Sequence, residues 1–179
     1  CHLVSNQTSC FGVEHCERML QFANYVFDAS VFELFTGLVN GLSVYLCDQS
    51  ICKSPLAIAQ FIEQELIDIT LLPRVILSGI ESGSLDSLKV LITGGAAPSQ
   101  RILDRFVDTS QVVNAYGPTE ATVCVSANHY QTGDLATTIG GPLPGMRLYV
   151  LDSNRQPVPV GVSGELYIAG AGLARGYLN

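Results

Sequence analysis

Groups that could bind a ligand follow several expected strands, where each strand gives way to a turn. Asp28 supplies a carboxylate, and Gly94-Gly95 exposes its backbone. The segment 114–120, with the sequence NAYGPTE, combines an amide, an aromatic ring, a hydroxyl and a second carboxylate. Ligands of open parallel sheets bind beyond the carboxyl ends of the strands. We therefore expect these groups, with Thr70 from a neighbouring strand, to share one crevice.

Each of these groups also has a purely structural explanation. Asp28 could cap the helix that follows it, and Thr119 could cap the turn after residue 118. Gly94-Gly95 could form an ordinary strand-to-helix turn. Their convergence on one edge of one sheet favours a binding site over these explanations.

The first two thirds of the chain alternate between strand and helix patterns. Expected strands cover 18–23, 43–47, 68–72, 88–93 and 111–115, and expected helices cover 28–40, 55–65, 73–80 and 98–106. The strands start too far apart for hairpins, at a spacing that suits parallel βα units. This pattern predicts an α/β fold, a mostly parallel, flavodoxin-like sheet with helices on both faces.

The pattern changes after Ala121. Segments rich in β-forming residues, separated by glycine- and proline-rich turns, lie at 123–130, 147–151 and 163–169. We expect residues 1–135 to form the α/β subdomain that carries the pocket. Residues 136–179 are expected to form a β-rich extension that begins the next subdomain.

The composition excludes several classes of protein. With 47% hydrophobic and 14% charged residues, the chain can bury enough apolar surface to offset its ordering entropy. Nucleic acid is not an expected partner, because the net charge is -7 and Lys and Arg together number only 9. A membrane is not expected either, since no uncharged run of about 18 apolar residues occurs.

The cysteines, 6 in number, form no CxxC pair and no Cys/His zinc spacing. Several lie in apolar runs, where a free thiol behaves as a small hydrophobe. We expect reduced structural thiols, no metal–sulfur site and a cytoplasmic location. The chain opens on Cys1 without an initiator Met, and its ends fall mid-pattern, which predicts a piece of a larger protein.

Three longer segments carry a family signature. They are NAYGPTEAT at 114–122, GELYIAGAGLARGYL at 164–178, and LQFA at 20–23 taken with FDASVFE at 27–33. They resemble core motifs of the amino-acid adenylation domains of nonribosomal peptide synthetases, which belong to the adenylate-forming superfamily. The resemblance runs the whole length of the chain in the family's order and spacing, and it implies an internal fragment of such a domain.

The resemblance implies a site for ATP and Mg²⁺. Asn114 would hydrogen-bond the adenine amino group, and Tyr116 would pack against the base. As the catalytic pair, Thr119 would touch the α-phosphate and Glu120 would help hold Mg²⁺, which takes carboxylate and phosphate oxygens. The other side of the base would be lined by the backbone of Gly95, Ala96 and Ala97.

The resemblance also implies an amino-acid pocket, in which Asp28 would pair with the α-ammonium group. The side-chain pocket would be lined by Ala29, Phe32, Thr70, Ile92, Gly94, Ala115, Val123 and Cys124. These residues are apolar or small apart from Thr70, and burying an unpaired charge among them would cost several kcal/mol. We expect a hydrophobic aromatic substrate, with phenylalanine first, tyrosine or a substituted phenylalanine second and leucine third.

Two of these positions favour a large ring. Phe32 stands where the bulkier Trp is common, and Gly94 lacks a methyl group that Ala would project into the pocket floor. Together they are expected to leave room for a para-substituent, with Thr70 as a hydroxyl partner.

The implied reaction joins the amino-acid carboxylate to the α-phosphate of ATP and releases pyrophosphate. The aminoacyl-adenylate then passes to the phosphopantetheine thiol of a peptidyl carrier protein. Catalysis would rest on positioning and charge neutralisation. The family's phosphate loop would precede Cys1, and its ribose-binding segment and catalytic lysine would follow Asn179, so the isolated fragment is expected to be inactive. Lys53 and Lys89 match no family motif.

Two alternatives remain at this stage. An acyl- or aryl-CoA ligase of the same superfamily would share the fold and the adenylation chemistry. Asp28 speaks against it, because a carboxylate at the pocket mouth suits an ammonium group and disfavours a plain fatty or aryl acid. The other alternative is a non-catalytic, flavodoxin-like binding module.

Overall fold

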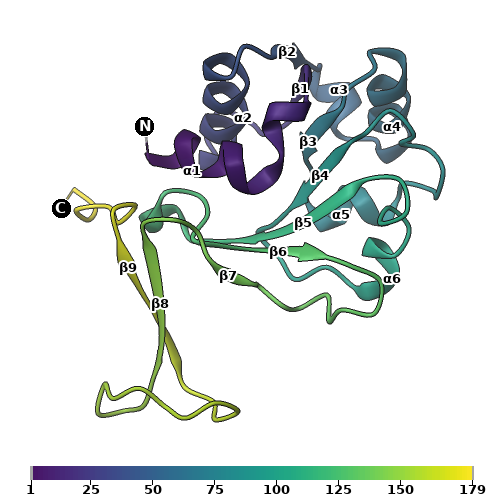
Figure 1. Cartoon of the computed structure of the whole chain (residues 1–179). Coiled ribbons are helices and arrows are strands. Elements are labelled where there is room, and N and C mark those ends of the chain that lie inside the picture. The colour runs from purple at the N-terminus through teal and green to yellow at the C-terminus, as the bar shows by residue number, and fades with distance from the viewer. Residues whose placement is uncertain (1, 179) are drawn as a thin grey trace.

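The structure, a computed structural model, describes residues 2–178 and contains a mixed sheet flanked by helices (Figure 1). Seven strands form one sheet in the order β2-β1-β3-β4-β5-β6-β7, and β8 and β9 pair separately. The strands are β1 (Arg18–Gln21), β2 (Ser43–Leu46), β3 (Ile69–Leu71), β4 (Val90–Thr93), β5 (Gln111–Tyr116), β6 (Ser126–Tyr130), β7 (Gly141–Pro142), β8 (Met146–Leu151) and β9 (Glu165–Gly170). The sheet is parallel from β2 to β5. Strand β6 pairs antiparallel with β5, and β7 pairs antiparallel with β6. The predicted α/β class is confirmed.

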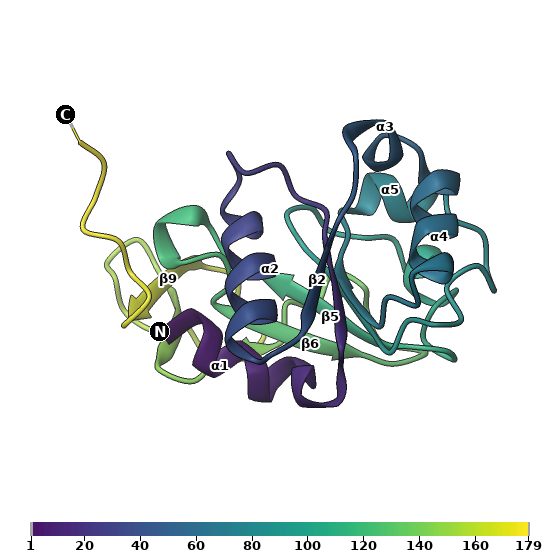
Figure 2. The same cartoon turned by 90° about the horizontal axis from the view of Figure 1, so that it is seen from above.

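Helices cover both faces of the sheet. They are α1 (His2–Phe11), α2 (Asp28–Val39), α3 (Gln49–Cys52), α4 (Pro55–Gln64), α5 (Arg74–Ser78) and α6 (Gln100–Leu103), with 3₁₀ turns η1 (Val13–His15) and η2 (Thr119–Ala121). In both views α1 and α2 lie to one side of the sheet, and α4 and α5 lie to the other (Figure 1 and Figure 2).

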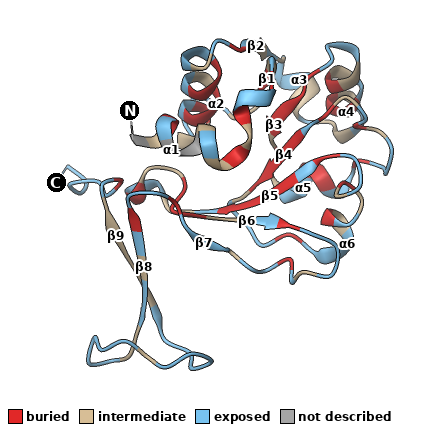
Figure 3. Cartoon of the chain, viewed as in Figure 1, coloured by how far each residue is buried: buried red, intermediate tan, exposed pale blue. Residues whose placement is uncertain are grey.

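Alternate residues of the central strands pack on opposite faces. In β4, Leu91 joins the core cluster that contains Ile62 of α4. Its neighbours Val90 and Ile92 join the second cluster, which contains Phe32 of α2. Buried residues accordingly concentrate on the central strands (Figure 3). Because both faces are covered, these strands are almost continuously hydrophobic, as expected for buried parallel strands.

The predicted helix ends agree with the structure at two positions. The hydroxyl of Ser54 accepts the backbone N–H of Ala57 at 3.3 Å, capping α4 directly before Pro55. Gly41 follows the C-cap residue of α2 with a φ of 75°, a left-handed conformation that suits glycine.

Other expectations needed correction. Neither α1 nor α3 was expected, and α6 covers only Gln100–Leu103 of the helix expected at 98–106. The N-cap of α2 is Phe27, so Asp28 is the first residue of the helix and not its cap. The first strand, expected to reach residue 23, ends at Gln21. The backbone N–H groups of Phe22 and Ala23 donate to the side chain of Glu33 and therefore do not extend the sheet.

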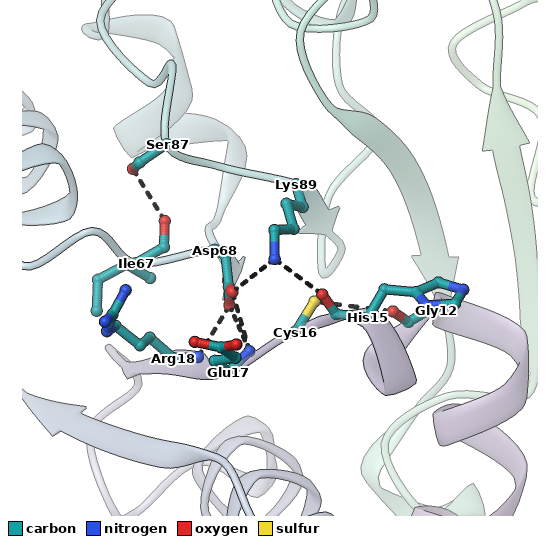
Figure 4. Close-up of polar contacts among 9 residues, drawn as sticks. All are labelled: Gly12, His15, Cys16, Glu17, Arg18, Ile67, Asp68, Ser87 and Lys89. Atoms are coloured by element: carbon teal, nitrogen blue, oxygen red, sulfur yellow. Dashed lines mark hydrogen bonds and ion pairs between the residues drawn. The ribbon is translucent and has the colours of Figure 1, made fainter.

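A buried carboxylate joins the amino ends of three strands (Figure 4). Asp68, directly before β3, accepts the backbone N–H groups of Glu17 and Arg18, each at 2.9 Å. Lys89, directly before β4, lies 3.2 Å from the same carboxylate and donates to the carbonyl of His15 at 2.9 Å. Lys89 therefore braces the ends of the strands that lie opposite the predicted crevice.

The β8–β9 hairpin extends away from the main sheet and is mostly exposed or half-buried (Figure 1 and Figure 3). The main sheet itself continues to β7, which pairs with β6. The boundary expected between 1–135 and 136–179 stays a prediction. Within residues 2–178, no helix has the length and apolar character needed to cross a membrane.

Candidate functional site

A cavity of about 810 Å³ lies beyond the carboxyl ends of β1, β3, β4 and β5. The sheet order brings these ends together, and the parallel register places Thr93 of β4 beside Asn114 of β5. The cavity is lined by Gln21, Phe22, Ala23, Asn24, Tyr25, Phe27, Asp28, Ala29, Cys47, Gln49, Cys52, Lys53, Leu71, Pro73, Gly94, Gly95, Ala115, Gly117, Val123 and Cys124.

The cavity collects many of the residues that the sequence assigned to the substrate. Those that line it are Asp28, Ala29, Gly94, Ala115, Val123 and Cys124. Asp28 is half-buried in the first turn of α2. Burial raises the pKa of the Cys124 thiol to about 12, and the nearby charge of Asp28 adds to this shift. The Cys124 thiol is therefore protonated at neutral pH.

Three of the predicted pocket residues lie in the core and do not line the cavity. Phe32, Thr70 and Ile92 are each 0% exposed. Phe32 packs edge-on against Phe11 of α1, with ring centroids 6.0 Å apart. The hydroxyl of Thr70 has no hydrogen-bond partner within the described part of the chain. Buried hydroxyls are usually paired, so Thr70 retains an unused hydrogen-bonding group in the core.

Gly94, which lines the cavity, also has a structural role that was not expected from the sequence. A Cβ atom built at Gly94 lies 2.8 Å from the carbonyl oxygen of Ala115 on the neighbouring strand. Such a contact forces the backbone to move, because neither atom belongs to a flexible side chain. The close approach of β4 and β5 therefore gives the glycine a structural reason, and its role in leaving space in the pocket stays a prediction.

The amide of Asn114 is held in place by the loop after β6. Asn114 is 5% exposed, and its Nδ2 atom donates to the carbonyl groups of Ala136 at 3.1 Å and Thr138 at 2.8 Å. Both amide hydrogens are used in these bonds. The side-chain oxygen is the group through which Asn114 would accept a hydrogen bond from the adenine amino group.

The other predicted base contacts lie at the surface. Tyr116, at the end of β5, is 38% exposed. Gly95 lines the cavity, and Ala96 and Ala97 are exposed in the same loop. Arg74 donates to the carbonyl of Ala97 at 3.0 Å and fixes this loop from α5. The structure thus places the aromatic ring and the loop on the neighbouring strand ends of β5 and β4.

Two of the family-like segments meet at Glu120. Thr119 and Glu120 are exposed in η2, directly after β5. Tyr177 donates its hydroxyl to Glu120 Oε1 at 2.9 Å, and the backbone N–H of Ala174 donates to the Glu120 carbonyl at 2.7 Å. The backbone N–H of Glu120 itself, and then the Tyr177 hydroxyl, lower the pKa of the Glu120 carboxyl. Glu120 is therefore a carboxylate at neutral pH.

Glu120 has the chemistry that a magnesium ion requires. It is an exposed, ionised carboxylate, and Mg²⁺ is commonly held by one or two carboxylates together with substrate phosphates. Between residues 2 and 178, no group of three or more His, Cys, Asp or Glu is arranged to hold a metal by itself. The Glu120 carboxylate therefore fits as one protein ligand of Mg²⁺.

The sequence did not predict the wall that follows β1. Phe22 and Ala23 line the cavity, and their backbone N–H groups donate to Glu33 at 3.1 Å and 2.9 Å. The side chain of Gln21 adds a bond to the same carboxyl at 3.2 Å. Glu33 is 0% exposed in α2, and burial raises its pKa to about 8 despite these donors. Glu33 therefore fixes the position of the backbone at Phe22 and Ala23 without lining the cavity itself.

A second wall comes from the segment after β2. Cys47, Gln49, Cys52 and Lys53 all line the cavity, although no ligand role was expected for them. A search for the residues that follow each parallel strand would have found them, because β2 ends at Leu46. The exposed Lys53 adds an ammonium group to a lining that was expected to carry no cation.

Comparison with known proteins accounts for this arrangement. Residues 1–178 match the family model described as AMP-binding enzyme. The chain belongs to the AMP-binding enzyme family. Bacitracin synthase 3 of Bacillus licheniformis is 39% identical over 178 residues, which cover 99% of this chain and 3% of that protein. Tyrocidine synthase 1 of Brevibacillus parabrevis is 34% identical over 172 residues, which cover 94% of this chain and 16% of that protein.

Two solved structures of nonribosomal peptide synthetases are also similar. A four-domain synthetase bound to AMP and glycine has a TM-score of 0.85 and 26% identity, over 98% of this chain and 14% of that one. A protein containing adenylation and PCP domains has a TM-score of 0.85 and 24% identity, over 98% and 38%. The second likeness concerns the fold alone. This member of the AMP-binding enzyme family thus resembles nonribosomal peptide synthetase adenylation domains, as its motifs predicted, and spans a small part of these relatives.

Proposed function

We propose that the chain forms the substrate-selecting core of an amino-acid-activating adenylation domain. The reaction joins an amino acid to the AMP portion of ATP, releases pyrophosphate, and passes the aminoacyl group to the phosphopantetheine thiol of a carrier protein. The observation that carries the proposal is the position of Asp28, a half-buried carboxylate in the wall of a cavity beyond β4 and β5. A cytoplasmic location agrees with the free thiols of the described cysteines.

The cavity favours a hydrophobic aromatic amino acid, with phenylalanine as first choice. Asp28 pairs with the α-ammonium group, and the apolar part of the lining takes the side chain. Its apolar members are Phe22, Ala23, Tyr25, Phe27, Ala29, Leu71, Pro73, Ala115, Val123 and Cys124. Full burial of a phenylalanine side chain contributes about 1.5–3 kcal/mol. Tyrosine is the second choice and leucine the third, because a phenol ring buries nearly the same apolar area as phenylalanine and leucine buries less.

The nucleotide lies along the loops after β4 and β5. Tyr116 and the Gly95–Ala97 loop enclose the base, and Asn114 accepts a hydrogen bond from its amino group. Thr119 contacts the α-phosphate. Glu120 would hold Mg²⁺, which supplies positive charge to the phosphates when it is bound. The chain's own contribution to catalysis is to orient the two reactants and to exclude water between them.

The first test is isothermal titration of the chain with amino acids and with AMP. We expect phenylalanine to bind most tightly, followed by tyrosine and leucine, and we expect AMP to bind as well. Within a complete adenylation domain that carries the chain, phenylalanine should also drive the strongest ATP–pyrophosphate exchange. Tightest binding of glycine, lysine or an acidic amino acid would show that the pocket assignment is wrong, and the acidic case would point to Lys53.

The same assays separate the alternative functions. A CoA ligase would activate 3-phenylpropanoate, which lacks the ammonium group, at least as well as phenylalanine. The amino-acid assignment predicts a loss of about tenfold or more for that acid, since Asp28 would face no cation. A non-catalytic binding module would support no exchange with any acid in the complete domain.

A further inference from the structure

Two thiols meet in the wall of the cavity. The sulfur atoms of Cys47, directly after β2, and Cys52, the last residue of α3, are 2.7 Å apart. Both residues are half-buried and both line the cavity, so a small molecule in the cavity can reach them. A disulfide bond is about 2.05 Å long, so the sulfurs need to approach by only about 0.7 Å to become bonded.

Cys47 and Cys52 also contact the segment after β1, which Glu33 fixes through hydrogen bonds. The sulfur of Cys47 lies 3.8 Å from the carbonyl oxygen of Gln21, and that of Cys52 lies 3.9 Å from the carbonyl oxygen of Phe22. In the reduced state these contacts are weak S–H···O hydrogen bonds. Each thiol has a single hydrogen, for which these carbonyl groups compete with the partner sulfur atom. Oxidation removes both hydrogens, so the carbonyl groups of two cavity-lining residues lose their contacts with a thiol donor.

The remaining described cysteines have different surroundings. Cys16 donates to the carbonyl of Gly12 at 3.7 Å, and Cys124 is 8% exposed. Burial raises the pKa of both thiols to about 12, and burial followed by the hydrogen bond to Cys52 raises the pKa of Cys47 to the same value, so the sulfur contact and not the pKa distinguishes the pair. Within the described chain, Cys47 and Cys52 are the cysteines for which a contact between sulfur atoms is found.

We propose that Cys47 and Cys52 form a reversible disulfide that links oxidation by a small-molecule disulfide to the shape of the cavity. With a disulfide oxidant, one cysteine loses its proton to solvent and attacks the oxidant, which releases one thiolate. The second cysteine then attacks the mixed disulfide and releases the other thiolate. Two protein thiols are oxidised by two electrons, and one oxidant disulfide is reduced to two thiols.

Oxidation fixes α3 against the end of β2. Gln49, the first residue of α3, and Lys53, its C-cap residue, both line the cavity. A disulfide between Cys47 and Cys52 therefore restricts the movement of these two residues as well. The loss of the two donors loosens the contact between this segment and the wall after β1. Oxidation therefore lowers the affinity of the cavity for its amino acid, a consequence that rests on the proposed function.

The experiment treats the chain with oxidised glutathione and locates the bond by mass spectrometry after digestion with a protease that cleaves before aspartate. Cleavage before Asp28, Asp48 and Asp68 places the two cysteines in separate peptides, 28–47 and 48–67, each with one cysteine. We expect these peptides to be joined by a disulfide and to separate after treatment with dithiothreitol. Cys47→Ser and Cys52→Ser should each abolish the joined peptide, and Cys10→Ser should leave it unchanged.

Mixed disulfides with glutathione that never resolve, or a bond between other cysteines, would overturn the proposal. Titration of the oxidised and reduced chains with phenylalanine tests the link to the cavity. We expect about tenfold weaker binding after oxidation and full recovery after reduction. Equal affinities would overturn the link, whereas a reduced chain that binds no amino acid would instead contradict the proposed function.

Discussion

The carboxyl group of Glu33 accepts the backbone N–H of Ala23 at 2.9 Å and so joins α2 to the cavity wall that follows β1. The same carboxyl accepts the N–H of Phe22 at 3.1 Å. These bonds end the strand at Gln21 and turn the chain toward Asp28. A residue with no assigned ligand contact thereby determines where the substrate-facing backbone lies.

Glu33 gives the protein a distinct dependence of stability on pH. Burial raises its pKa from 4.5 to about 8. The folded state therefore holds a proton that the unfolded chain releases above pH 4.5, so stability from this group is complete below that pH and is lost as the pH approaches 8. In urea unfolding at pH 5, 6.5 and 8, Glu33→Gln should flatten this decline.

The matched control is Glu65→Gln, which replaces an exposed glutamate just after α4. Its pH profile should follow that of the wild type. A Glu33→Gln profile that also declines as steeply as the wild type would show that another group causes the dependence.

Asp68 and Lys89 form an ion pair at the amino ends of the strands, and replacing them should lower the free energy of unfolding by unequal amounts. Asp68→Ala leaves the N–H groups of the exposed Glu17 and the half-buried Arg18 without this acceptor, and should lower the free energy of unfolding by about 1–3 kcal/mol. Lys89→Met should cost about 1 kcal/mol or less, because its side chain is 54% exposed. Thermal and urea unfolding measure both, and equal losses would contradict the central role of Asp68.

The alternation of strands and helices could be predicted because it follows from the local spacing of hydrophobic residues along the chain. The expected helices at 28–40 and 55–65 agree closely with α2 and α4, whose ends carry local signals such as Ser54 and Gly41. The short α3 carries no such pattern, so its cavity-lining residues were missed. Glu33 was missed for a different reason, since its hydrogen bonds to the end of β1 exist only once α2 has packed on the sheet.

The sequence indicated where in the fold the pocket lies, but it did not show which of the assigned residues face the cavity and which face the core. Asp28, Ala115 and Cys124, which the family resemblance assigned to the pocket, line the cavity. Whether a lining residue faces the cavity or the core depends on tertiary contacts, such as the edge-on packing of Phe32 against Phe11 of the unexpected α1. Sequence periodicity shows that such a residue is buried, and it does not show what lies against it.

Asp28 is expected to separate amino-acid binding from nucleotide binding. Asp28→Asn keeps the size of the side chain and removes the charge that faces the substrate ammonium, so phenylalanine affinity should fall by about 10- to 100-fold. AMP affinity should stay unchanged, because the predicted nucleotide contacts come from β5 and the loop after β4. Asp86→Asn, an exposed carboxylate elsewhere, serves as the control in the same titrations. Unchanged phenylalanine affinity would leave Asp28 with only a structural role at the start of α2.

Gly94→Ala tests whether this glycine shapes the pocket or the sheet. A methyl group there meets the Ala115 carbonyl oxygen at 2.8 Å, and relieving the contact must displace Ala115, which lines the cavity. Overpacking of this kind costs about 1–3 kcal/mol, so the melting temperature should fall and phenylalanine and tyrosine should lose affinity to a similar degree. Gly141→Ala is the matched control, because a Cβ atom there meets nothing within 4 Å. A loss confined to tyrosine, at an unchanged melting temperature, would instead show that the methyl group fills space reserved for a para-substituent.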